Sequence, residues 1–248
     1  MLFKKRRVIQ SGACKEFRMT AKKVLVVGAG SGIGEALFAI LNKNSEQDVF
    51  GISRRGISSW AKIKSGFNYK CDVTNEAEII SFAEFYKNSF DAIDAIYLCQ
   101  GDGLFGELSS LTKDKIESHF SLNITSSFLI LQNFYPLLKL SNKNPFVCFL
   151  SSTAGKVGFP DSTAYCASKH AVAGLAKSLR EEWKKDQIRI FTVYPGAIST
   201  AIWDDRPGFD KNDMISPKDF ASYLKSFLFL PASINVDDSY VLPIKGIL

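Results

Sequence analysis

Near the start of the chain stand Val24-Leu25-Val26-Val27, an apolar run of strand length, followed by Gly28-Ala29-Gly30-Ser31-Gly32-Ile33-Gly34 and then Glu35-Ala36-Leu37. Glycines in such a turn permit positive φ and let backbone N–H groups approach a pyrophosphate, while the N-terminus of the next helix favours negative charge. A turn whose glycines serve packing alone is the alternative. The position between a first strand and a helix favours a dinucleotide-binding turn.

Apolar runs of strand length alternate with longer segments of helical period along the rest of the chain. We expect strands at 23–27, 48–52, 67–71, 95–99, 146–150, 188–194 and 239–242, and helices at 32–42, 76–88, 113–141, 164–184 and 217–229. This order predicts the α/β class: a doubly wound Rossmann-type parallel sheet of about seven strands with helices on both faces. Such sheets bind ligands at the carboxyl ends of their strands.

The size and charge of the chain indicate one domain with a basic extension. The chain has 248 residues, of which 46% are hydrophobic and 23% charged, as in an ordinary soluble globular protein. Residues 1–23 carry eight Lys and Arg against one Glu, a net charge of +7, so the other 225 residues carry −1 of the total +6. We therefore expect a basic N-terminal extension at 1–21 and a single NAD(P)-binding domain at 22–248. The extension is either disordered or the result of an upstream start, with Met19 as the true first residue; a surface arm or organellar presequence is the alternative.

Composition also argues against several partners. Residues 24–248 have almost no net charge, which disfavours a nucleic-acid binder. The most apolar stretch, residues 128–140, is too short to span a bilayer, so we expect no membrane partner. The five cysteines are odd in number and form no Cys-x-x-Cys pair, which disfavours disulfides and a metal site. No secretory apolar segment follows the N-terminal charges, and we expect a cytoplasmic protein.

A second motif, Tyr165-Cys166-Ala167-Ser168-Lys169, has Ser152 thirteen residues before its tyrosine. On a helix, residues i and i+4 share a face, so the ammonium of Lys169 can lie beside the phenol of Tyr165 and lower its pKa. The Ser152 hydroxyl, carried on a separate strand end, can hold a carbonyl oxygen that the tyrosine protonates. Taken alone, the pair has an alternative interpretation, an aromatic residue beside a solvated lysine on a helix surface.

Together these motifs resemble the short-chain dehydrogenase/reductase family. The spacing Gly28-x-x-x-Gly32-x-Gly34 is similar to that family's turn, with Val27 where threonine is usual. The resemblance implies a catalytic set of four residues: Asn123, Ser152, Tyr165 and Lys169. In that set Tyr165 donates the proton and Ser152 polarises the oxygen; Lys169 lowers the tyrosine pKa and binds the nicotinamide ribose, and Asn123 holds a water that links Lys169 to solvent.

The end of the expected second strand, Ser53-Arg54-Arg55, bears on the cofactor. An NAD enzyme would place a carboxylate here, whereas a hydroxyl and a guanidinium suit a 2′-phosphate, so we expect NADP(H), with NAD(H) as the alternative. By resemblance, the cofactor-binding residues are Gly28, Ser31, Gly32, Ile33, Gly34, Ser53, Arg54, Arg55, Asp72, Val73, Gly101, Tyr165, Lys169, Pro195, Gly196, Ile198 and Thr200. Leu98-Cys99-Gln100-Gly101 departs from the family's Asn-Asn-Ala-Gly and keeps only the glycine.

The substrate half of the site is less defined. The resemblance implies a substrate lid near 199–216, a small-molecule carbonyl or alcohol substrate, and a homodimer or homotetramer. With Phe159 and Leu104 nearby, the pocket looks mainly apolar. The expected function is an NADP(H)-dependent oxidoreductase that interconverts a carbonyl compound and a secondary or primary alcohol. A non-catalytic NADP(H)-binding sensor is the alternative, favoured by the altered segment at 98–101 and opposed by the complete catalytic set.

Overall fold

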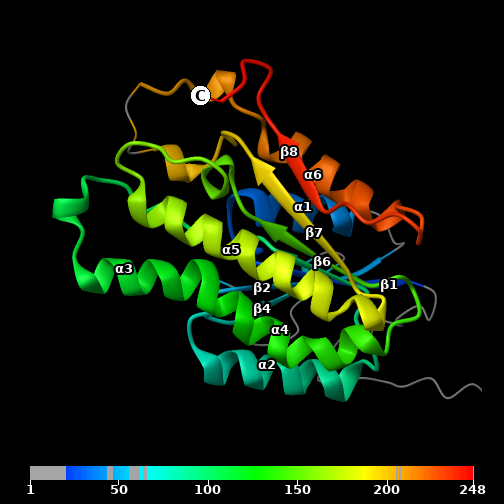
Figure 1. The fold of residues 1–248 in the computed structure, drawn as a ribbon. Helices are drawn as coiled ribbons and strands as arrows, with labels where there is room; N and C mark the ends of the chain where they lie inside the picture. The colour runs from blue at the N-terminus through cyan, green and yellow to red at the C-terminus, as the bar shows by residue number, and fades with distance from the viewer. Residues whose placement is uncertain are drawn as a thin grey trace, which may run out of the picture.

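The computed structural model describes residues 21–43, 47–55, 62–63, 66–204, 206 and 208–247. Within these residues, eight strands form one sheet in the order β3-β4-β2-β1-β5-β6-β7-β8 (Figure 1). Their bounds are β1 Lys22–Val27, β2 Gln47–Ser53, β3 Lys62–Ile63, β4 Gly66–Lys70, β5 Ala95–Leu98, β6 Phe146–Leu150, β7 Arg189–Pro195 and β8 Asp238–Val241. All pairs are parallel except β3 with β4, so the predicted parallel sheet is confirmed, with β3 as a short antiparallel addition.

Helices cover both faces of the sheet, as Figure 1 shows. The bounds are α1 Gly32–Asn42, α2 Glu76–Ser89, α3 Lys113–Phe120, α4 Ser126–Lys139, α5 Thr163–Glu182 and α6 Pro217–Ser226. Buried side chains of α2, α4 and α5 form the core on one face, and those of α1 and α6 form the core on the other. Because both faces are covered, the central strands are rich in apolar residues, and every residue of β7 is buried.

The segment predicted as one helix at 113–141 is interrupted. A π-helical turn, Ser121–Thr125, separates α3 from α4, and Asn123 at its centre is buried. Such a turn holds one residue more than an α-helical turn and is frequent at functional sites. The side chain of Asn123 turns to the loop after β5, where its Oδ1 accepts from Asp102 N at 2.9 Å and its Nδ2 donates to Asp102 O at 3.1 Å. These bonds give the interruption a physical reason that helical periodicity does not reveal.

The predicted lid at 199–216 begins and ends at neighbouring backbone segments. Ser199 N donates to Ile215 O at 2.9 Å, and Ile215 N donates to Ala197 O at 3.1 Å. Asp205 and Pro207 of this segment lie outside the described residues, as does the predicted extension apart from Ala21. No helix in the described part of the chain is both long enough and apolar enough to cross a membrane.

Candidate active site

The predicted site residues gather at the carboxyl edge of the sheet. The glycine-rich turn follows β1, Gly101 follows β5, Ser152 follows β6, and the segment from Pro195 follows β7. Parallel strands end at the same edge, so residues distant in the sequence become neighbours there. The order of the sheet, with β1, β5, β6 and β7 adjacent, brings the turn and the catalytic candidates to one region.

Tyr165, Ser152 and Lys169 form a buried cluster. Tyr165 lies in the first turn of α5, and the nearby Ser152 side chain acts on the pKa of its phenol. Lys169 Nζ lies 5.8 Å from the centre of the Tyr165 ring and donates to Leu150 O at 3.1 Å. At Gly155 a Cβ would lie 2.7 Å from Lys169 O, so glycine lets this helix approach the strand end closely. The i, i+4 spacing therefore places the ammonium near the Tyr165 ring, as predicted, where it also donates to a backbone carbonyl.

Burial controls the ionisation of both groups. Burial raises the pKa of Tyr165 more than the Ser152 hydrogen bond and the nearby Arg206 charge lower it. Burial likewise lowers the pKa of Lys169 to about 8, against an opposing effect of the Asp102 charge. Burial of the phenol has the largest effect on the Tyr165 pKa here, and the Lys169 ammonium donates to a backbone carbonyl, so the role predicted for Lys169 stays a prediction.

A polar network that the sequence interpretation missed lies behind the cluster. His119 Nδ1 lies 2.8 Å from Asp102 Oδ1, and its Nε2 lies 3.1 Å from both Ser168 Oγ and Asn123 Nδ2. Ser168 Oγ donates to Tyr165 O at 2.8 Å and accepts from Asn123 Nδ2 at 3.1 Å. The network thus joins Asn123 to the helix that carries the tyrosine and lysine. The available signals were spacings alone: His119 one helical turn before Asn123, and Ser168 next to Lys169.

The glycine-rich turn has the shape that a dinucleotide needs. Gly28 has φ +81°, and a Cβ there would lie 2.8 Å from Gln100 N; a Cβ at Gly34 would lie 2.2 Å from Gly28 O. Ser31 is the exposed N-cap residue of α1, and its side chain makes no capping hydrogen bond. The hydroxyl and the helix N-terminus are therefore available to a phosphate, and the residues present fit the pyrophosphate of a nicotinamide dinucleotide.

At the end of β2, the two arginines differ in their contacts. Arg55 Nη2 donates to Gly30 O at 2.8 Å and so braces the glycine-rich turn. Arg54 is exposed, and its guanidinium makes no hydrogen bond or ion pair with the described residues. Ser53 is buried, and its hydroxyl lies 3.4 Å from Asn68 Oδ1. Of the two arginines, Arg54 is therefore the one whose guanidinium has no partner among the described residues.

The other predicted cofactor residues flank the same turn. Asp72, which precedes Val73, accepts from Thr74 N at 3.0 Å and Thr74 Oγ1 at 2.8 Å through Oδ1, so this carboxylate is held in place. Thr200 lies against the turn, since a Cβ at Gly32 would be 3.4 Å from its Cγ2. Ile198 is buried and forms a bridge to Ile215 at the base of the lid segment.

Residues 98–101, which depart from the family's Asn-Asn-Ala-Gly pattern, are held by hydrogen bonds to α4. Gln100 Nε2 donates to Ser126 Oγ at 3.1 Å and to Ser127 Oγ at 3.0 Å, at the start of α4. At Gly101 a Cβ would lie 3.1 Å from Asn123 Oδ1 and 3.4 Å from Lys169 Nζ. The retained glycine therefore lies against two of the catalytic candidates as well as beside the predicted cofactor site.

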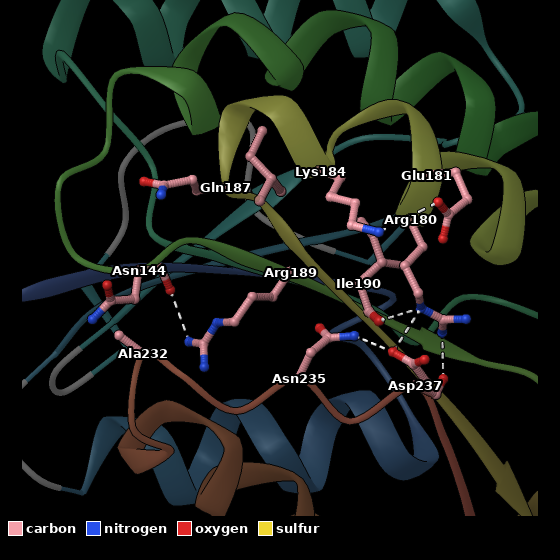
Figure 2. Close-up of a pocket in the computed structure, with 11 residues that line it drawn as sticks. Asn144, Arg180, Glu181, Lys184, Gln187, Arg189, Ile190, Ala232, Asn235 and Asp237 are labelled. Carbon is pink, nitrogen blue, oxygen red and sulfur yellow. Dashed lines mark hydrogen bonds and ion pairs between the residues drawn. The ribbon is translucent and has the colours of Figure 1, made fainter.

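A separate pocket of about 460 Å³ lies at the opposite, amino edge of the sheet (Figure 2). It is lined by Asn144, Arg180, Glu181, Lys184, Gln187, Ile188, Arg189, Ile190, Ala232, Asn235 and Asp237. Both arginine guanidinium groups there donate to backbone oxygens, Arg180 to Ile190 O and Arg189 to Asn144 O. These arginines hold loops together, and the pocket contains none of the predicted site residues.

Comparison with known proteins identifies the class. Residues 22–209 match the family model described as short chain dehydrogenase, and the chain belongs to the short-chain dehydrogenase/reductase family of oxidoreductases, which act on the CH–OH/carbonyl couple with a nicotinamide cofactor. The predictions of family and enzyme class are thereby confirmed.

Individual relatives resemble the chain over most of its length. It is 26% identical over 230 residues to an uncharacterized oxidoreductase of Staphylococcus aureus, covering 91% of this chain and 99% of that protein. It is 25% identical over 236 residues to a sepiapterin reductase of Chlorobaculum tepidum, covering 90% and 96%. The structure of an alcohol dehydrogenase of the archaeon Thermococcus sibiricus, complexed with 5-hydroxy-NADP, matches with a TM-score of 0.78 at 20% identity, covering 90% and 97%.

Proposed function

We propose that this protein is an NADP(H)-dependent oxidoreductase that interconverts a carbonyl compound and a secondary or primary alcohol, with Tyr165 as general acid and base. The observation that carries the proposal is that the side chains of Ser152, Tyr165 and Lys169 lie together at the sheet edge that bears the glycine-rich turn. A proton donor and a second hydroxyl that meet at one point are what the oxygen of a reacting carbonyl requires.

The chain's own residues handle the proton in this reaction. When bound, the nicotinamide would supply a hydride, which carries two electrons, to the carbonyl carbon, or accept one in the reverse direction. In reduction, Tyr165 Oη donates its proton to the carbonyl oxygen, and Ser152 donates a hydrogen bond to the same oxygen. The raised pKa keeps Tyr165 protonated at neutral pH, which suits the reductive direction. Lys169 and Asn123 return a proton from solvent and orient the cofactor ribose.

The proposed cofactor preference rests on Arg54. Its exposed guanidinium would bind the 2′-phosphate, and Ser53 would add a hydroxyl, whereas no carboxylate stands at this strand end to hold a free 2′-hydroxyl. The Thermococcus sibiricus structure in complex with 5-hydroxy-NADP supports a cofactor of this kind. We further propose that residues 22–248 form one domain, that 199–216 act as its lid, and that α4 and α5 contact a second subunit; Phe128 of α4 is 47% exposed.

The test is NADPH oxidation with a panel of aldehydes and ketones, measured for the wild type and for Tyr165→Phe. We expect the variant to lose about 10²- to 10⁴-fold in rate, with an unchanged Kd for NADPH. Tight NADPH binding without turnover across a broad panel would instead favour the sensor. Equal rates for the two proteins would contradict the role of Tyr165.

A further inference from the structure

Arg206 lies in the lid segment 199–216, half-buried among three aromatic rings. Its Cζ lies 4.1 Å from the ring centre of Phe105, 5.1 Å from that of Phe209 and 5.2 Å from that of Trp203. A guanidinium is attracted to the faces of aromatic rings, and contacts of this kind restrict its position without using its N–H donors. The cation is therefore held in place with its hydrogen-bonding capacity intact.

Two acidic residues of the described part of the lid segment, Asp204 and Asp213, pair with lysines. Lys211 pairs with Asp204, and Lys245 pairs with Asp213 at 2.7 Å. Within the described residues, the guanidinium of Arg206 makes neither a hydrogen bond nor an ion pair. A half-buried guanidinium whose five donors have no partner among the described residues is a candidate to bind an anion.

Arg206 faces the proposed reaction centre. The ring of Phe105, on which the guanidinium stacks, lies 5.2 Å from the ring of Tyr165, centre to centre. The positive charge acts on the pKa of Tyr165, lowering it against the larger effect of burial. The Asp102 charge raises the same pKa, and the Asp102 carboxylate contacts His119 Nδ1 at 2.8 Å. A substrate whose carbonyl reaches Tyr165 can thus extend toward the Arg206 guanidinium.

We propose that Arg206 forms a carboxylate-binding subsite and that the substrate is an oxo acid, or the corresponding hydroxy acid in the reverse direction. This inference rests on the proposed function of the same site. The planar guanidinium can hold a carboxylate through two parallel hydrogen bonds. The rings of Phe105, Trp203 and Phe209 would contact the carbon chain between carboxylate and carbonyl.

The binding test uses 4-oxopentanoate and its neutral amide, 4-oxopentanamide, with the NADP⁺-loaded protein, which cannot reduce a ketone. Calorimetry should show the acid binding about tenfold more tightly than the amide, as a charge-assisted pair at a half-buried site implies. In Arg206→Met this preference should fall to about twofold or less, and in Lys211→Met, a matched lid cation already paired with Asp204, it should persist. Equal binding of acid and amide by the wild type, or an unchanged preference in Arg206→Met, would overturn the inference.

Turnover separates this inference from the proposed function. With NADPH, Arg206→Met should raise the KM for 4-oxopentanoate about tenfold more than the KM for the amide. Tyr165-dependent reduction of both ketones with no effect of Arg206→Met would reject the subsite and leave the proposed function standing. An acid preference that Arg206→Met removes, without reduction of either ketone, would support the subsite and reject the proposed function.

Discussion

His119 Nδ1 lies 2.8 Å from Asp102 Oδ1, and the other ring nitrogen faces the amide of Asn123 at 3.1 Å. The carboxylate favours the tautomer with its proton on Nδ1, so Nε2 accepts from the Asn123 side chain. The Asp102 side chain is 58% exposed whereas that of His119 is 2% exposed. The pair therefore connects a solvent-facing carboxylate to the buried asparagine, and we interpret His119 as a positioning residue.

Replacing His119 should disturb catalysis through Asn123. In His119→Phe the buried amide of Asn123 and the hydroxyl of Ser168 each lose a partner, which costs about 1–3 kcal/mol of the free energy of unfolding. We expect kcat to fall about tenfold while KM changes little, and His119→Asn to recover part of the loss. The measurements are steady-state kinetics and urea denaturation.

The matched control is His170→Phe, because His170 is exposed on α5 and its ring hydrogen-bonds only to Cys166 O among the described residues. Equal losses in the two Phe variants would contradict the positioning role.

The lowered pKa of Lys169 predicts a pH dependence of stability. Between the folded pKa of about 8 and the ordinary value of 10.5, the unfolded chain binds more protons at this lysine than the folded protein does. Stability contributed by this group therefore rises with pH through that window. The difference in unfolding free energy between wild type and Lys169→Met should shift in favour of the wild type by up to about 3 kcal/mol from pH 8 to 10.5. Chemical denaturation at several pH values measures it, and a pH-independent difference would contradict the buried ammonium.

Arg54 should determine the preference between the two cofactors. Arg54→Ala removes the guanidinium proposed to bind the 2′-phosphate, so we expect the Kd for NADPH to rise about 10- to 100-fold and that for NADH less than about twofold. Fluorescence titration with both cofactors measures the two values. Arg55→Ala is the control: it breaks the hydrogen bond to Gly30 O and should weaken both cofactors alike. Equal losses of NADPH and NADH in Arg54→Ala would reject the 2′-phosphate assignment.

Two helical glycines should respond oppositely to alanine. In Gly34→Ala the new Cβ would lie 2.2 Å from Gly28 O and 3.3 Å from Cys99 Cβ, so the turn must shift. We expect a loss of about 1–3 kcal/mol in unfolding free energy and at least about tenfold weaker dinucleotide binding. In Gly174→Ala no atom lies within 4 Å of the new Cβ, and the free energy of unfolding should rise by about 0.5–1 kcal/mol. Calorimetric unfolding and NADPH titration of both variants check this; normal cofactor binding by Gly34→Ala would contradict the close packing of the turn.

Much of the fold was predictable, because local hydrophobic patterns in the sequence indicate which segments form strands and which form helices. The alternation of apolar strands and amphipathic helices gave the parallel sheet, and element bounds such as those of α1 agree with the prediction. The break in the helix at 121–125 was not predictable, since it depends on hydrogen bonds between Asn123 and a residue 21 positions earlier. The two-residue strand β3 was also missed, because Lys62 and Ile63 show no periodic pattern.

For the candidate site, the sequence by itself determined which chemical groups are present: the glycines of the turn, the Ser152, Tyr165 and Lys169 set, and two arginines after β2. Spacing within one element is enough for such assignments, because i and i+4 on a helix always share a face. Only the tertiary structure decided where the Lys169 ammonium points, that His119 and Asp102 support Asn123, and that Arg206 stacks on Phe105 near the phenol. Burial, hydrogen bonding and charge act between side chains that are distant in the sequence, so these relationships exist only once the sheet and its helices have packed together.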